Sequence, residues 1–261
     1  MAITTVSRAP TASSAADQVK REVSAVTRLL EAEGILDYSG HVSTRIPGRD
    51  AFVIQIGSAS RAEVEPASML ICDYDGKVLE GDGAPPVELP IHTEILKVRP
   101  DVQSVLHSHM ELAIAFTMME GVKLVPMRAR ASRWKSGIPI DPDPSHIKLK
   151  EQGQALAKSL GPHHAVLMRA HGLCLVAESA RALFVDAVHF KENTTAQMQA
   201  LQAGAKPIPL TDAEIAQIEK MEIRDWHIKK LWNYYTRKAT KHGILPSEWN
   251  LVPSQETMKR D

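Results

Sequence analysis

The sequence predicts an α/β fold, and three observations support this expectation. Short apolar runs typical of strands, such as FVIQI at 52–56, alternate with segments whose apolar residues recur at helical spacing. Turns rich in glycine and proline separate these segments. The 261 residues contain no internal repeat, low-complexity segment or clear linker, so we expect one large domain.

The composition argues against several classes of function. The 31 basic and 31 acidic residues cancel, so no global field attracts nucleic acid or a membrane surface. No apolar run reaches the ~18 residues that a membrane-spanning helix needs, and the N-terminal MAITTVSRAPTASSAA lacks the apolar core of a signal peptide. Cys72 and Cys174 lie far apart in apolar contexts and are expected to be reduced core residues. We therefore expect a soluble cytoplasmic protein.

The first elements follow from local patterns. Residues 1–13 are expected to form a flexible tail, and the domain to run from 14 to 261. A helix is predicted at 15–33, where Val19, Val23, Val26 and Leu30 have helical spacing and Gly34 acts as a stop. The segment GHVSTR at 40–45 is typical of a turn that enters a strand. Further strands are predicted at 52–56 and 69–73, with a hairpin turn at 74–77.

The stretch from Val87 to His109 carries the strongest chemical pattern. Glu88 and His92 open a short helix that Pro100 and Asp101 end, and 102–109 is predicted to be a strand. Residues two apart in a strand face the same side, so His107 and His109 could reach one ion. Imidazole and carboxylate ligands suit zinc, manganese or iron, so Glu88 and the two histidines make a partial metal site. On spacing alone the alternative stays open that this pair arises by chance among 11 histidines.

The second half of the chain alternates between helices and short strands. Helices are predicted at 111–119, 146–160 and 179–202, and strands at 124–127, 165–168 and 173–176. A capping box formed by Thr211 and Glu214 predicts the start of a last helix, which runs towards Gly243. In this last helix Ile228, Leu231, Trp232 and Tyr235 form an apolar stripe that favours a core or subunit-interface position. His189 is likewise expected to be a core or interface histidine.

Two segments could bind anions. Arg128, Arg130, Arg133 and Lys135 follow one another without an intervening acid and could clamp a carboxylate or phosphate. They could equally form a solvated or inter-subunit loop. The segment GSASR at 57–61, which contains Ser60 and Arg61, could cradle a ligand or merely make a turn.

Four motifs in this order resemble the class II aldolase/adducin family over nearly the whole chain. They are GHVSTR at 40–45, the helix opening Glu88-Leu-Pro-Ile-His92, RPDVQSVLHSH at 99–109, and RAHGL at 169–173. The resemblance implies a single three-layer α/β/α domain around a largely antiparallel sheet. It also implies a homo-oligomer, a tetramer or hexamer, that acts on a small-molecule substrate.

The resemblance also implies the roles of individual residues. His107, His109 and His171 would bind a divalent ion (zinc, manganese, iron or cobalt), with Glu88 as a fourth ligand or an acid/base. Glu88 and His92 are the expected catalytic residues. The expected substrate-binding residues are His41, Ser43, Ser60, Arg61, Arg133 and Tyr235. Because the adducin branch lacks the metal ligands and this chain keeps the three histidines, we expect a metal-dependent lyase.

Three departures from the family's sugar-phosphate aldolases bear on the substrate. Those enzymes place glycine-asparagine at the phosphate, where this chain has Gly40-His41. They also use a threonine-glycine turn and two serines before the glutamate, where this chain has GSASR and Pro86-Val87. Arg61 and the loop at 128–135 instead offer cations to carboxylates. The sequence thus resembles the decarboxylases of ortho-dihydroxy aromatic acids of the 3,4-dihydroxyphthalate type.

Two other functions remain as alternatives. An aldolase for a sugar phosphate or hydroxy-keto acid would release an aldehyde. A non-catalytic adducin-like interaction module would tolerate loss of the metal.

Overall fold

The structure is a computed structural model that describes residues 12–252. The predicted tail therefore lies outside the described residues, except for Ala12 and Ser13, which belong to helix α1 (Ala12–Ala32). This helix covers most of the segment predicted at 15–33. Gly34 follows it with a positive φ of 63°, a conformation that glycine adopts without strain.

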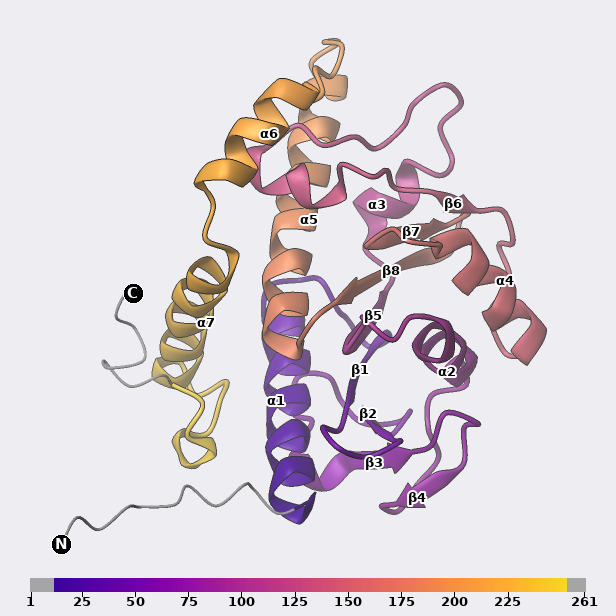
Figure 1. The fold of residues 1–261 in the computed structure, drawn as a ribbon, viewed down its shortest axis with the longest axis vertical. Helices are drawn as coiled ribbons and strands as arrows, with labels where there is room; N and C mark the ends of the chain where they lie inside the picture. Colours follow the sequence, from indigo (N-terminus) through magenta and orange to yellow (C-terminus); the bar gives the residue numbers. More distant parts are fainter. Residues whose placement is uncertain (1–11, 253–261) are drawn as a thin grey trace, which may run out of the picture.

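An eight-stranded sheet forms the middle of the molecule, in the order β4-β3-β2-β1-β5-β8-β7-β6 (Figure 1). The strands are β1 (His41–Arg45), β2 (Phe52–Gln55), β3 (Met69–Cys72), β4 (Val78–Glu80), β5 (Ser104–Ser108), β6 (Ile140–Asp141), β7 (Ala165–Met168) and β8 (Gly172–Ala177). The hairpin turn predicted at 74–77 joins β3 to β4. The strands β4 and β6 were not predicted, because each is too short to show a period.

The sheet is mixed, which corrects the expectation that it is largely antiparallel. The pair β6–β7 runs parallel, and the other neighbouring pairs run antiparallel. A parallel pair needs a crossover connection, and helix α4 (Lys150–Leu160) provides it between β6 and β7. This unit was not predicted, because β6 has only two residues and shows no pattern in the sequence.

Helices cover both faces of the sheet (Figure 1). Helix α2 (Leu89–Val98) and α4 bury one apolar cluster against it. Helices α1, α3 (Glu111–Ala115) and α5 (Ala180–Gln202) bury a second cluster on the other face, and α7 (Arg224–Lys241) packs on α5 and α1. In β5, Leu106 belongs to the cluster beside α1, whereas Val105 belongs to the cluster beside α2. Because strand side chains alternate, His107 lies on the α2 face.

Three predicted elements differ from the structure, and in two of them side chains occupy backbone hydrogen-bonding groups. The segment predicted as a helix from 146 begins its helix only at Lys150, and the N–H of Ile147 donates instead to Glu88. The strand predicted at 124–127 is irregular, since the N–H groups of Val125 and Met127 donate to side-chain amides of α5 rather than to a strand. The helix predicted at 111–119 ends early, at Ala115.

The predicted C-terminal helix is two helices. Helix α6 (Asp212–Met221) begins with the expected capping box of Thr211 and Glu214, and Glu222 and Ile223 separate it from α7. In the apolar stripe, Trp232 and Ile228 are buried, as expected for core positions. Cys72 and Cys174 are buried free thiols, which confirms that prediction. Among the helices of residues 12–252, none is long and apolar enough to cross a bilayer.

Candidate metal centre

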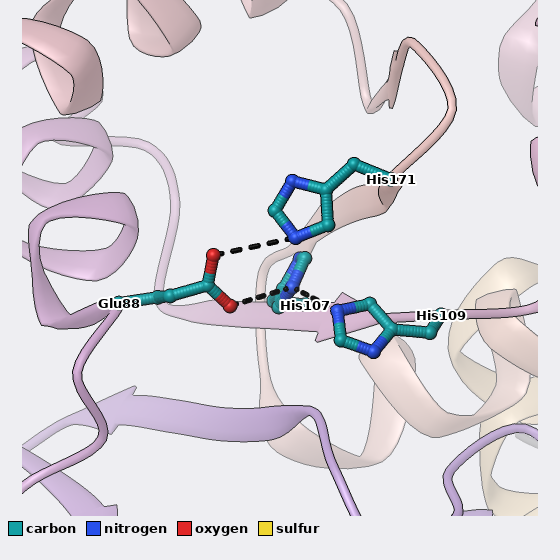
Figure 2. Close-up of side chains that lie close together, drawn as sticks. All are labelled: Glu88, His107, His109 and His171. Atoms are coloured by element: carbon teal, nitrogen blue, oxygen red, sulfur yellow. Dashed lines mark hydrogen bonds and ion pairs between the residues drawn. The ribbon is translucent and has the colours of Figure 1, made fainter. Parts of the chain in front are cut away.

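Glu88, His107, His109 and His171 converge on one point (Figure 2). Glu88 precedes the first turn of α2, His107 lies in β5, His109 follows that strand, and His171 lies in the turn between β7 and β8. Their ligand atoms all lie within 4.8 Å of one another. The metal-ligand set expected from the sequence is therefore brought together from three separate parts of the chain.

The spacing of these atoms fits a tetrahedral ion. His107 Nε2 lies 3.0 Å from His109 Nε2 and 3.2 Å from Glu88 Oε2. His171 Nε2 lies 3.3 Å from Glu88 Oε1. Bonds of 2.0–2.1 Å to one tetrahedral ion would separate neighbouring ligands by about 3.3 Å. The cluster could accept such an ion with small side-chain movements.

Hydrogen bonds orient two of the imidazoles. His107 Nδ1 lies 3.1 Å from the carbonyl oxygen of Leu173, so we assign the proton to Nδ1 and the lone pair to Nε2, which faces the cluster. His109 Nδ1 is held in the same way by Ser39 Oγ at 2.8 Å. Partners of this kind fix the tautomer and direction of metal-binding histidines.

His171 supports the fit of a metal for another reason. Neither of its ring nitrogens makes a hydrogen bond, although both are buried and Nε2 lies near Glu88. Buried polar atoms without a partner are rare in folded proteins, and a bound ion or water is one physical explanation for them. An ion at the centre of the cluster would satisfy Nε2.

A glycine lets the three histidines approach. A Cβ added to Gly172 would lie 2.7 Å from the Ser108 carbonyl oxygen, 3.0 Å from His107 and 3.1 Å from His109. Any side chain at this position would therefore push β8 away from β5 and open the cluster. In the RAHGL motif, His171 thus provides a possible ligand, and Gly172 leaves the space that the neighbouring histidines need.

The charges of the cluster also favour a cation. Burial raises the pKa of Glu88, but the neighbouring imidazoles of His107 and His171 outweigh it and hold this pKa well below its usual range. Burial, with His107 and His171 nearby, lowers the pKa of His109 to about 4. At neutral pH the cluster therefore combines a carboxylate with a neutral His109 imidazole, which is the protonation state that binds metal.

His92 and Ser43 lie behind this cluster. His41 Nε2 is 4.0 Å from Glu88 Oε2, while His41 Nδ1 is 2.6 Å from His92 Nε2. His92 Nδ1 in turn lies 2.6 Å from Ser43 Oγ. His41 lines the adjoining cavity, whereas His92 and Ser43 are fully buried and do not. Neither His92 nor Ser43 therefore contacts the cavity directly. Any effect of these two residues on a ligand would have to be transmitted by His41.

A cavity of about 630 Å³ adjoins the cluster. Part of its lining is polar and includes His41, Glu88 and His109. Another part is apolar and consists of Ile56, Ala84, Pro85, Pro86 and Val87. A flat apolar ligand with polar groups along one side would match this lining.

His146 is a site residue that was not predicted from the sequence. Its Nδ1 lies 3.4 Å from Glu88 Oε1, and its ring centroid lies 5.0 Å from that of His171. This residue was predicted to begin a helix, and no sequence spacing connects it with the other histidines. The proline-rich segment before it leads this residue to the cavity, where its side chain stays exposed.

Arg61 lines the cavity, but its guanidinium is already engaged. It donates to the carbonyl oxygens of Gly40, Gly57 and Ala59 at 2.9, 3.0 and 2.6 Å. Burial lowers the pKa of Arg61. In this conformation Arg61 supports the two loops of the cavity wall.

The structure does not bring Ser60, Arg133 or Tyr235 to the cluster. Ser60 is exposed and does not line the cavity. Arg133 donates to Asp186 and Glu178 at 3.1 and 2.9 Å and lines a different cavity. Tyr235 packs its ring against Phe184, with centroids 4.9 Å apart. Within this chain, Arg133 and Tyr235 make structural contacts instead, and Ser60 is an exposed loop residue.

The basic loop at 128–135 contains the helical turn η2 (Ala129–Trp134), and all four of its cations pair with acids. Arg128 pairs with Glu192, Arg130 with Glu222, Arg133 with Glu178 and Asp186, and Lys135 with Glu219. The alternative of a clamp for a substrate anion is therefore not supported within this chain.

Comparisons with known proteins agree with this geometry. Residues 21–199 match the family described as Class II Aldolase and Adducin N-terminal domain. A 3,4-dihydroxyphthalate decarboxylase of Arthrobacter keyseri is 28% identical over 201 residues, which cover 72% of this chain and 79% of that protein. The resemblance expected from the sequence, to this family and to its aromatic-acid decarboxylases, is confirmed.

Solved structures show the same fold. An aldolase II superfamily protein from Pseudomonas syringae has a TM-score of 0.77 at 20% identity, covering 92% of this chain and 97% of the other. An L-fuculose 1-phosphate aldolase from Glaciozyma antarctica has a TM-score of 0.76 at 19% identity, covering 92% and 96%. At such identities the likeness concerns the fold.

Proposed function

Because the chain belongs to the class II aldolase and adducin family, we propose that it is a divalent-metal-dependent carbon–carbon lyase. We propose further that it decarboxylates an ortho-dihydroxy aromatic acid of the 3,4-dihydroxyphthalate type. The observation that carries this proposal is the cluster of Glu88 with three histidines beside a partly apolar cavity. The name of the Arthrobacter relative points to the same chemistry.

The residues present fit a zinc, manganese, iron or cobalt ion. His107, His109 and His171 would hold it, with Glu88 as fourth ligand or as a free carboxylate. Such an ion supplies Lewis acidity towards a substrate oxygen. Ser39 and the Leu173 carbonyl keep two of the imidazoles aimed at the ion.

Glu88 is suited to move the proton that decarboxylation requires. The pair of electrons from the broken carbon–carbon bond stays on the ring carbon, carbon dioxide leaves, and that carbon takes up a proton. Since its pKa is held low, Glu88 is a carboxylate before substrate binds. As a carboxylate it has the oxygen lone pairs needed to accept the proton of a substrate hydroxyl and to return it to the ring carbon, a form of general acid–base catalysis. The Nε2 atom of His41 lies 4.0 Å from Glu88 Oε2 and can stabilise this carboxylate.

The cavity wall favours an aromatic substrate over a sugar phosphate. Pro86 and Val87 stand where the sugar-phosphate aldolases resembled by the sequence have two serines, and both line the cavity. These side chains offer no hydrogen-bond donor to a phosphate, but they provide apolar surface for a ring. Cleavage of a sugar phosphate is the second candidate, because the fold also matches L-fuculose 1-phosphate aldolases.

An assay of two products separates the candidates. The metal-loaded protein would be incubated with 3,4-dihydroxyphthalate and, separately, with a ketose 1-phosphate, while carbon dioxide and aldehyde are followed together. We expect carbon dioxide from the aromatic acid and no aldehyde from the ketose. His171→Ala is the matched control, since it removes a ligand without touching the apolar wall. Aldehyde without carbon dioxide would establish the aldolase instead.

A further inference from the structure

The proposed substrate has two carboxylates, and only one leaves as carbon dioxide. If the hydroxyls of this substrate face the metal ligands, the carboxylate next to a hydroxyl lies nearest to them, and the other carboxylate lies one ring position further away. A carboxylate that enters an apolar cavity needs a cationic partner, because burying an unpaired charge is costly. The cations that the sequence suggested for this task, Arg133 and its neighbours, are neutralised elsewhere.

Lys148 is the candidate that the cavity itself offers. It lines the cavity together with Arg61, whose guanidinium already donates to three carbonyl oxygens. The Lys148 side chain is exposed, and among residues 12–252 its ammonium makes no salt bridge or hydrogen bond. An unpaired ammonium at a cavity mouth can bind an anion without first losing another partner.

Two anchors hold Lys148 at this place. Ile147, the residue before it, is buried in the core under α4 and donates its N–H to Glu88 Oε1 at 3.0 Å. The N–H groups of Lys148 and Leu149 both donate to Gln152 Oε1, at 2.9 and 3.0 Å. The backbone of Lys148 is therefore tied on one side to the metal centre and on the other to the first turn of α4.

We propose that Lys148 binds the carboxylate that stays on the substrate ring, and so selects dicarboxylic over monocarboxylic aromatic acids. This inference rests on the proposed function. His146 lines the same cavity and lies on the other side of the buried Ile147, so the segment 146–148 presents two polar side chains to one ligand. Lys148 would act as a binding residue that places the leaving carboxylate next to Glu88.

Binding of two inert ligands tests the proposal without turnover. 3,4-Dihydroxybenzoate keeps the second carboxylate, whereas catechol lacks both and retains the two hydroxyls. Each would be titrated calorimetrically into the zinc-loaded wild type and into the Lys148→Met, Lys148→Arg and Lys150→Met variants. Lys150 is a matched control because it is exposed, begins α4 and does not line the cavity.

We expect Lys148→Met to weaken 3,4-dihydroxybenzoate binding about tenfold, the effect of losing one charge-assisted contact of about 1.4 kcal/mol. The same variant should leave catechol binding unchanged. Lys148→Arg should retain most of the affinity, and Lys150→Met should bind both ligands like the wild type.

These measurements distinguish a failure of the Lys148 inference from a failure of the proposed function. If Lys148→Met binds both ligands like the wild type, the role of Lys148 is overturned while the proposed function stands. If the wild type binds neither ligand, the proposed function is overturned, and this inference with it. Equal weakening of catechol and 3,4-dihydroxybenzoate would also contradict the inference, since a contact to the carboxylate cannot affect catechol.

Discussion

The Nδ1 atom of His41 lies 2.6 Å from the Nε2 atom of His92, and this contact connects the cavity wall with the interior. Burial, with charge from neighbouring histidines, lowers the pKa of both imidazoles, for His92 to about 3. Each ring is therefore neutral and has one donor and one acceptor nitrogen. If the Ser43 hydroxyl donates to His92 and His92 to His41, then His41 Nε2 carries a proton that faces Glu88. We assign the hydrogen bonds in this order because it gives the Glu88 carboxylate a donor on the His41 side.

Replacing His92 should therefore disturb Glu88 indirectly. We expect His92→Phe to lower kcat/KM by about tenfold and to destabilise the fold by about 1–3 kcal/mol, because His41 Nδ1 and Ser43 lose a buried partner. His92→Gln, which keeps polar groups, should recover part of both losses. Steady-state kinetics and urea unfolding would measure the two effects. Wild-type turnover in His92→Phe would show that His41 does not depend on its hydrogen bond to His92.

The purified protein should contain about one divalent ion per chain. Elemental analysis is expected to find this ion in the wild type and to find little in His107→Ala and His171→Ala, since each removes one of the converging nitrogens. His163→Ala is a suitable control, because this histidine bonds to Ser136 and is not part of the cluster. Full metal content in both ligand variants would disprove the assignment.

Glu88→Gln should separate chemistry from folding. Glutamine keeps the Oε1 acceptor for the Ile147 N–H, so the thermal midpoint should change little. It lacks the basic oxygen, and general acid–base catalysis is worth ~10²–10⁴ in rate. We therefore expect turnover to fall by that factor. Glu88→Ala should in addition lose the hydrogen bond to the Ile147 N–H and about 1–3 kcal/mol of stability. If Glu88→Gln is as active as the wild type, Glu88 has no role in the mechanism.

Arg133 should matter for stability and not for substrate binding. It shares the buried carboxylate of Asp186 with Arg224, whose guanidinium lies 2.8 Å away. Removing one of two partners from a buried charge should cost about 1–2 kcal/mol, less than complete loss of its pairing. Urea unfolding of Arg133→Ala should show this loss, and the KM for the aromatic acid should be unchanged. A large rise in KM would revive the substrate clamp that the sequence suggested.

Local patterns were sufficient for most elements of the fold. The spacing of Val23, Val26 and Leu30 predicted α1, and the Thr211 and Glu214 pair predicted the start of α6. These features depend on contacts within a few residues, so the sequence contains their physical cause. The predictions failed where distant side chains intervene, as at Val125 and Met127, whose N–H groups bond to amides of α5.

For the candidate site, the sequence by itself determined the chemical groups. His107 and His109 share a face because strand side chains have a period of two, and the motifs around Glu88 and His171 supplied the other two groups through their resemblance to a family. Only the tertiary structure decided which polar groups share the cavity. It brought in His146 and Lys148, and it placed Ser60, Arg133 and Tyr235 elsewhere. The physical reason is that these positions depend on how loops are anchored by contacts such as Ile147 to Glu88, between residues 59 positions apart, which no local pattern encodes.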